Sequence, residues 1–189
     1  MRIIAGKHRG RRLHSIPGSD VRPTMDRVRE ALFSILGTDA VEDRTVLDLF
    51  AGTGAFGLEA LSRGATEAHF VEAARVHLEV LRRNIEAVRE GERCHVHGGP
   101  VEMVLPRLAR GGPRFGLIFM DPPYRRGIVA ETLKLVDRLR LLSEDGRLVA
   151  EHESRYTPPV QVGRLLRSDH RRYGDTEVSM YSQLSGGTA

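Results

Sequence analysis

The sequence predicts an α/β protein whose mostly parallel sheet is covered by helices on both faces. After residue 44, short apolar runs alternate with segments in which apolar residues recur at helical spacing. The runs are apolar at nearly every position, as is typical of strands buried on both faces. The chain has 189 residues, of which 40% are hydrophobic and 29% charged. This length suits one domain with a well-buried core.

The alternation predicts the core elements in order, within an expected domain of residues 44–184. Strands are expected at residues 45–50, 68–71, 94–97, 116–120 and 147–151. Helices are expected from the glycines after the first strand to about Arg63, and around residues 78–88, 103–108 and 129–139. Segments 162–172 and 176–182 flank Gly174-Asp175, which predicts an antiparallel hairpin at one sheet edge. Residues 185–189 are expected to form a flexible tail.

Residues 1–43 are expected to form an extension in front of this core. Two short segments, 2–6 and 11–15, are separated by Gly6 and Gly10, which predicts a small β-hairpin. A helix is expected from an N-cap at Thr24 to about Leu36, with Arg27 and Arg29 outside its buried face. Its apolar stripe would consist of Met25, Val28, Leu32, Ile35 and Leu36.

The positive charge of the chain is concentrated in this extension. Residues 1–30 carry eight basic and three acidic side chains, a net charge of +5, whereas the whole chain has a net charge of +4. Such clustering is typical of a surface that contacts a phosphate backbone. A solvated arginine-rich arm is the alternative, and we favour nucleic-acid contact over it.

Several classes of protein are excluded. No apolar run reaches the roughly 20 residues of a membrane-spanning helix, and charges interrupt the N-terminus where a signal peptide would be apolar. Cys94 is the single cysteine, so an internal disulfide is impossible and the expected compartment is the cytoplasm. The eight histidines lack H-x-x-x-H and H-E-x-x-H spacing, and we therefore expect no metal site.

A glycine-rich loop follows the first core strand. Gly52, Gly54 and Gly57 match G-x-G-x-x-G, and Glu72 follows Gly52 by 20 residues at the end of the next strand. A carboxylate at that place can accept hydrogen bonds from both ribose hydroxyls of a nucleotide-like cofactor. Asp48 would be unfavourable beside a pyrophosphate but suits a cationic cofactor, which favours S-adenosylmethionine over a nicotinamide or flavin dinucleotide.

The fourth strand runs directly into Asp121-Pro122-Pro123-Tyr124. The exocyclic amine of a nucleobase is a poor nucleophile, because its lone pair is delocalised into the ring. Hydrogen bonds from the amine to the Asp121 carboxylate and to the Pro122 carbonyl would localise that pair. The two prolines fix the backbone that presents this carbonyl. Tyr124 offers a flat face on which an unstacked base can lie.

The order of these motifs resembles a known family. A basic hairpin is followed by Arg22-Pro23-Thr24, Arg27-Val28-Arg29-Glu30, the segment 48–57, Glu72, the segment 121–124 and Tyr173-Gly174-Asp175-Thr176. This order resembles that of bacterial methyltransferases of the RsmD type, which modify the N2 amine of a guanine in 16S ribosomal RNA. The resemblance implies a Rossmann-like, seven-stranded fold with S-adenosylmethionine as methyl donor. It also implies the assembled or partly assembled small ribosomal subunit as substrate, and we expect a monomer.

The resemblance and the motifs together give the expected site residues. Asp121, Pro122, Pro123 and Tyr124 would be catalytic. The cofactor would contact Asp48, Phe50, Gly52, Thr53, Gly54, Glu72, Ala73, Pro100 and Val101. RNA would contact Arg2, Lys7, Arg9, Arg11, Arg12, Arg22, Arg27, Arg125 and Arg126. Related enzymes hold the adenine amine with a small polar residue where this chain has Gly98-Gly99-Pro100, so that contact must come from elsewhere.

Three other functions compete with this interpretation. An adenine-N6 methyltransferase of DNA shares the Asp-Pro-Pro-Tyr turn, but this sequence offers no separate module for reading DNA bases. A nicotinamide oxidoreductase shares the glycine loop, but Asp48 and the Asp121 turn argue against it. A ribosome-assembly protein without catalysis would not need both Asp121 and Glu72. We therefore expect methyl transfer to the N2 amine of a guanine.

Overall fold

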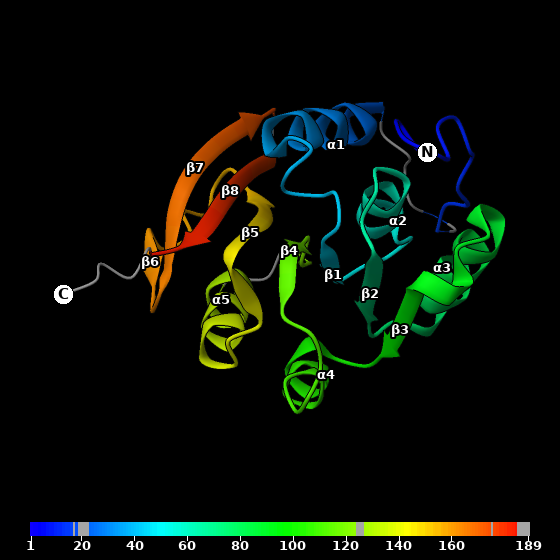
Figure 1. Cartoon of the computed structure of the whole chain (residues 1–189). Coiled ribbons are helices and arrows are strands. Elements are labelled where there is room, and N and C mark those ends of the chain that lie inside the picture. Colours follow the sequence, from blue (N-terminus) through cyan, green and yellow to red (C-terminus); the bar gives the residue numbers. More distant parts are fainter. Residues whose placement is uncertain (17, 19–22, 124–126, 175, 185–189) are drawn as a thin grey trace.

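The computed structural model describes residues 1–184 apart from positions 17, 19–22, 124–126 and 175. The described chain is built around one sheet of eight strands in the order β3-β2-β1-β4-β5-β8-β7-β6 (Figure 1). The strands are β1 (Thr45–Leu49), β2 (Glu67–Glu72), β3 (Cys94–Gly98), β4 (Phe115–Met120), β5 (Leu142–Glu153), β6 (Gln161–Val162), β7 (Leu165–Tyr173) and β8 (Thr176–Gln183). The first five strands pair in parallel, and β8 joins β5 antiparallel.

Helices cover both faces of this sheet. They are α1 (Pro23–Leu36), α2 (Ala55–Ser62), α3 (Arg75–Val88), α4 (Val101–Leu108) and α5 (Ile128–Arg138), with a short 3-10 turn at Gly91–Arg93. Leu32, Leu58 and Leu81 from α1, α2 and α3 pack with Phe70 and Phe119 on one face. Residues of α4 and α5 pack on the other face with Leu47, Ile118 and Tyr181. Along each buried strand, successive residues belong alternately to these two groups, because successive side chains point to opposite faces of the sheet.

The predicted fold class is confirmed. Every strand and helix expected in the core is present, and the antiparallel pair of β7 and β8 turns at Gly174, which has φ of +66°. The resemblance implies seven strands, whereas the described sheet has eight. The additional strand is β6, whose residues Gln161 and Val162 pair with Leu166 and Leu165. No helix in the described segments is long and apolar enough to span a membrane. The expected tail, residues 185–189, lies outside the described residues.

The buried stripe of α1 differs from the expected one. Val28, Leu32 and Phe33 are buried, whereas Ile35 is 37% exposed. Arg29 was expected outside the buried face but is only 2% exposed. Its guanidinium Nη2 donates to the Arg2 carbonyl at 2.6 Å and to Asp26 at 3.0 Å, and these hydrogen bonds compensate part of the cost of burial, whereas its buried Nε makes none. Burial lowers the pKa of Arg29, against the opposing effects of Asp26 and Glu59.

The predicted N-terminal hairpin is present as a short antiparallel bridge between Arg2 and Arg12. Ile3 and Leu13 from this hairpin belong to the same buried cluster as Val46 and Phe70. Gly6, with φ of +79°, lies so close to the Ser62 carbonyl that any Cβ would collide with it. The extension is therefore packed onto the sheet and its helices rather than projecting from them.

Glu59 of α2 fixes the extension in place. Its fully buried carboxylate accepts hydrogen bonds from the backbone N–H groups of Ile4 at 2.7 Å and Ala5 at 3.0 Å. The same carboxylate accepts one from Arg63 Nε at 2.7 Å and lies 3.8 Å from Arg29 Nε. Because the buried charge is shared among three hydrogen-bond donors and an ion pair with Arg29, each partner depends on the others.

We predict that Glu59→Gln lowers the free energy of unfolding by about 3–5 kcal/mol, because the amide removes one of the two counter-charges of the buried Arg29 and turns an NH2 donor toward groups that are themselves donors. Urea denaturation followed by circular dichroism measures the change. Glu86→Gln on the exposed face of α3 is the matched control, expected within about 0.5 kcal/mol of wild type. Equal stability of the two variants would contradict the role given to Glu59.

Candidate active site

The candidate site lies where the strand order reverses. β1 is flanked by β2 on one side and by β4 on the other, so the connections leaving β1 and β4 diverge at their carboxyl ends. Ligands of open parallel sheets bind at such a switch point. The glycine loop follows β1 and the Asp121 turn follows β4, so the two predicted motifs lie at the same sheet edge.

Glycine is needed at the three positions of the loop for different structural reasons. At Gly54 and Gly57 a Cβ would approach Leu81 and Phe70 to within 2.3 and 2.4 Å, so these glycines are required by packing. Gly52 has φ of +54°, and a Cβ there would meet nothing closer than 3.8 Å. Gly52 therefore serves the turn and leaves the space in front of the backbone open.

Glu72 holds the loop in its shape. One carboxylate oxygen accepts the Gly52 N–H at 2.8 Å, and the other accepts the Ala74 N–H at 2.7 Å. The residue is 7% exposed, and Oε2 lies 3.4 Å from His77 Nδ1. A carboxylate has about four acceptor sites, so both oxygens retain capacity for further donors such as a ribose diol.

Asp48 is buried beneath the loop. Its Oδ2 accepts the Gly57 N–H at 2.9 Å and so joins β1 to the first turn of α2. Burial raises the pKa of Asp48 to about 8; the Gly57 hydrogen bond opposes this rise, and the nearby Asp121 and Glu72 carboxylates add to it. Carboxyl groups from the ends of β1, β2 and β4 thus lie close enough to influence one another.

A fourth carboxyl group, missed by the sequence analysis, lies beside Asp121. Met120 of β4 and Ala150 of β5 are register partners, so Asp121 and Glu151 follow them at neighbouring positions. Burial raises the pKa of both groups, and the Asp121 charge raises that of Glu151 further. The sequence did carry a signal, because Glu151 ends a buried apolar run at the carboxyl edge, as Glu72 does.

A cavity of about 380 Å³ opens at Phe50 and Val101, both expected to contact the cofactor. Glu102, Ile128 and Thr132 complete most of its wall. Phe50 has φ of +58°, an unusual value for a residue other than glycine and one found at functional sites. Pro100 precedes α4 in an extended conformation, and the exposed Ala73 lies next to Glu72.

Asn84 of α3, also missed by the sequence analysis, joins the loop to the N-terminal segment. Its fully buried side chain donates to the Thr53 carbonyl at 2.9 Å and to the His14 carbonyl at 3.1 Å. Its Oδ1 accepts the His14 N–H at 2.7 Å. Asn84 therefore holds the basic extension, at His14, beside the predicted cofactor loop.

Most of the expected RNA-contact residues are exposed where the structure describes them. Exposed side chains are those of Arg2, Lys7, Arg9, Arg11, Arg12 and Arg27. Lys7 also pairs with Glu90 at 3.0 Å. Tyr124, Arg22, Arg125 and Arg126 lie outside the described residues.

The parallel sheet, the loop held by Glu72 and the Asp-Pro-Pro turn after β4 define a methyltransferase of the Rossmann-like class. Over 187 residues the chain is 38% identical to Ribosomal RNA small subunit methyltransferase D of Escherichia coli strain K12, covering 99% of this chain and 92% of that protein. It is 36% identical to Bacillus subtilis YlbH over 183 residues, covering 97% and 99%. The Escherichia coli yhhF structure matches with a TM-score of 0.82 at 34% identity, covering 98% of each chain.

Residues 1–182 match the family described as Conserved hypothetical protein 95. The chain belongs to this family, the RsmD-type ribosomal RNA methyltransferases.

We predict that Asp48→Asn stabilises the protein at alkaline pH and hardly at pH 5. A carboxyl group with a pKa of about 8 when folded, and about 4 when unfolded, holds more protons in the folded state between those values. Stability therefore falls as pH rises through that window, by up to about 1.4 kcal/mol per pH unit. The amide keeps an acceptor for Gly57 but carries no charge.

Thermal unfolding of both proteins between pH 5 and 9 measures this effect. The melting-temperature difference should grow with pH. Asp39→Asn, in an exposed loop, is the matched control and should show no such trend. A difference for Asp48→Asn that is constant across the range would contradict the prediction.

Proposed function

We propose that this protein transfers a methyl group from S-adenosylmethionine to the exocyclic N2 amine of a guanine in 16S ribosomal RNA. The observation that carries the proposal is the half-buried Asp121 at the switch point, beside a glycine loop that Glu72 holds in shape. We further propose that the substrate is the assembled or partly assembled small subunit, and that the enzyme acts as a monomer.

The residues at the switch point fit S-adenosylmethionine. Glu72 presents carboxylate oxygens with remaining acceptor capacity to the ribose, and the open space at Gly52 admits a ligand close to the backbone. A cationic ligand near Asp48 and Glu72 would favour the charged form of the Asp48 carboxyl group, whereas a pyrophosphate would oppose it. The cavity at Phe50 and Val101 offers an apolar wall to the adenine.

When bound, the cofactor supplies an electrophilic methyl carbon. The task of the protein is to prepare the amine. Asp121 and the carbonyl of the buried Pro122 accept its two N–H bonds, which directs the nitrogen lone pair toward the cofactor. Transfer would form the N–C bond as the bond from sulfur to the methyl group breaks and leaves a neutral thioether, and the cationic amine would give one proton to Asp121. Because burial raises the pKa of Asp121 to about 6, this carboxylate is a better proton acceptor than an ordinary aspartate.

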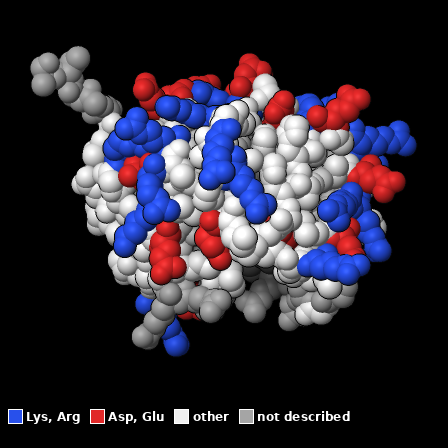
Figure 2. All heavy atoms as spheres, turned by 90° about the horizontal axis from the view of Figure 1, so that it is seen from below, with Lys and Arg blue, Asp and Glu red and all other residues white. Residues whose placement is uncertain are grey.

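The basic extension supplies the RNA contact. Most of its exposed arginines lie in the hairpin. Hydrogen bonds to Asn84 and Glu59 attach this hairpin to the core beside the glycine loop. By contrast, Figure 2 shows basic and acidic side chains interspersed on the face seen from below Figure 1. A short arm cannot read a long sequence, so specificity would come from the shape of a folded RNA that presents one guanine for unstacking.

We predict that Asp121→Asn reduces kcat for methyl transfer by on the order of 10²–10⁴ while cofactor affinity stays within a few-fold of wild type. The amide removes the proton acceptor but not the cofactor contacts. Calorimetry measures the affinity, and transfer of labelled methyl groups to small-subunit particles measures kcat. Glu151→Gln, which keeps the neighbouring group neutral, should lose at most about tenfold. Comparable kcat in Asp121→Asn and wild type would show that the turn is only structural.

We predict that Arg9→Ala, Arg11→Ala and Arg12→Ala together weaken binding to small-subunit particles and reduce the slope of log K against log salt by up to about three units, since each lost phosphate contact removes roughly one. Binding at several salt concentrations measures the slope. A matched triple variant removes the exposed Arg107, Arg110 and Arg138 of the α4 and α5 segments. Equal slopes for both triples would show that the extension is only a solvated arm.

A further inference from the structure

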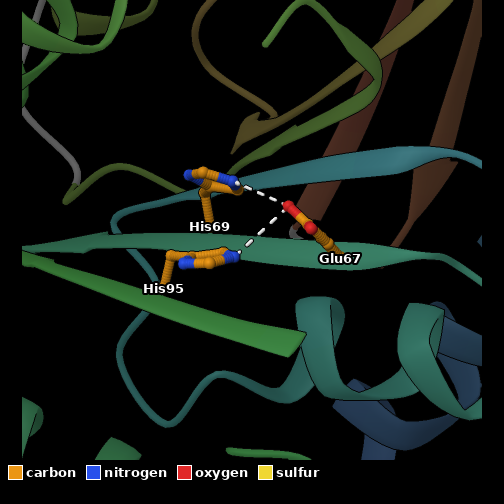
Figure 3. A group of neighbouring side chains, drawn as sticks. All are labelled: Glu67, His69 and His95. Carbon is orange, nitrogen blue, oxygen red and sulfur yellow. Dashed lines mark ion pairs between the residues drawn. The ribbon is translucent and has the colours of Figure 1, made fainter. Parts of the chain in front are cut away.

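Three potential metal ligands converge on β2 and β3, away from the methyl-transfer site. His69 Nε2 and His95 Nε2 lie 3.7 and 3.3 Å from the same oxygen of Glu67, and Figure 3 shows both imidazoles directed at that carboxylate. Glu67 and His69 share one face of β2 because they are two residues apart, and His69 and His95 are register partners. All three ligand atoms lie within 4.8 Å of one another.

The two imidazole nitrogens that face Glu67 have no hydrogen-bond partner within the described part of the chain. Both atoms are buried, and His69 as a whole is only 7% exposed. Buried polar atoms without a partner are rare in proteins and point to a group that completes the site. The other ring nitrogen of His69 is already engaged, because Nδ1 lies 3.1 Å from His97 Nε2.

This arrangement of His69 is typical of a metal-binding histidine. A hydrogen bond at one ring nitrogen orients the imidazole and leaves the other nitrogen directed at the ion.

A second group of potential metal ligands, formed by His152, His170 and Glu177, has no buried imidazole nitrogen that lacks a partner. His152 Nδ1 and Nε2 contact the Glu153 carbonyl and Ser179 Oγ at 3.1 and 3.0 Å. His170 Nδ1 lies 3.1 Å from Ser179 Oγ, and its Nε2 lies 3.1 Å from Glu177. Three of these four ring nitrogens are within hydrogen-bonding distance of a protein oxygen, and the fourth, His170 Nε2, pairs with Glu177 more closely than His69 or His95 does with Glu67, so the group needs no ion to satisfy it.

We propose that Glu67, His69 and His95 bind a divalent first-row transition-metal ion of the zinc class. Two imidazoles and a carboxylate suit such ions. Ligands about 2.05 Å from a tetrahedral ion are about 3.3 Å apart, close to the separations of 3.3 and 3.7 Å found here. The histidine spacing in the sequence gave no sign of this site, because its ligands come from two strands rather than from one helix.

The site is structural rather than catalytic. Glu67 begins β2 and Glu72 ends it, which separates the ion from the methyl-transfer site by about 16 Å at 3.3 Å per residue. β3 is the edge strand of the sheet and holds His95. The ion would clamp this edge strand to β2, and its loss would lower stability without removing methyl transfer.

Calorimetric titration of untagged, chelator-treated full-length protein with Zn²⁺ tests the proposal. We expect one ion per chain and a higher melting temperature with Zn²⁺. His69→Gln and His95→Gln should each weaken binding by about a hundredfold or more, and His97→Gln by about 10–100-fold through the orientation of His69. Glu67→Gln, at a half-exposed position, should weaken binding without affecting folding, as judged by circular dichroism.

His170→Gln is the matched control and should leave both affinity and stoichiometry unchanged. The proposal would be overturned if wild type bound no Zn²⁺, or if binding survived the His69, His95 and Glu67 substitutions. It would equally be overturned if His170→Gln weakened binding as much as His95→Gln does. These outcomes do not depend on whether the protein methylates RNA, because the readouts are metal binding and thermal stability.

Discussion

The site depends first on the Glu72 carboxylate, which accepts backbone N–H groups from both loops that leave β1 and β2. These two hydrogen bonds determine where the glycine loop lies and how the carboxylate faces the switch point. Asp48 adds the contact that joins β1 to α2. The site is thus shaped before any ligand binds, and the ligand is recognised by groups that already have fixed positions.

Three carboxyl groups with raised pKa values lie at one sheet edge, where their charged forms lower the stability of the fold and where they can serve the proposed methyl transfer. Burial raises the pKa values of Asp48, Asp121 and Glu151, so each of these charged forms opposes folding. A cationic cofactor would relieve this repulsion, and in the proposed mechanism Asp121 takes a proton from the methylated amine. The N-terminal extension is bound to the same region through Glu59 and Asn84, so the proposed RNA-contact surface is attached directly to the proposed catalytic site.

Much of this structure could be predicted from the sequence. The core strands and helices, and the position of Glu72 at a strand end near the glycine loop, follow from local patterns, namely apolar period, glycine spacing and residues at strand ends. The hydrogen bond from the Gly52 N–H to Glu72 was not predicted. The other features depend on neighbours distant in sequence. Arg29 is buried because Asp26, Glu59 and the Arg2 carbonyl surround it, which no helical pattern reveals. Asn84, Glu151 and the Glu67 group gain their partners only through strand register and helix packing.

The most direct test of the central claim is the chemical identity of the methylated nucleoside. Purified protein, S-adenosylmethionine carrying an isotopic methyl label and small-subunit particles that lack the modification would be combined, and the digested 16S RNA analysed by mass spectrometry. The account predicts label in N2-methylguanosine at one position, approaching one methyl group per particle. Label in N6-methyladenosine, label only in ribosomal protein, or no label with active cofactor-bound enzyme would contradict it.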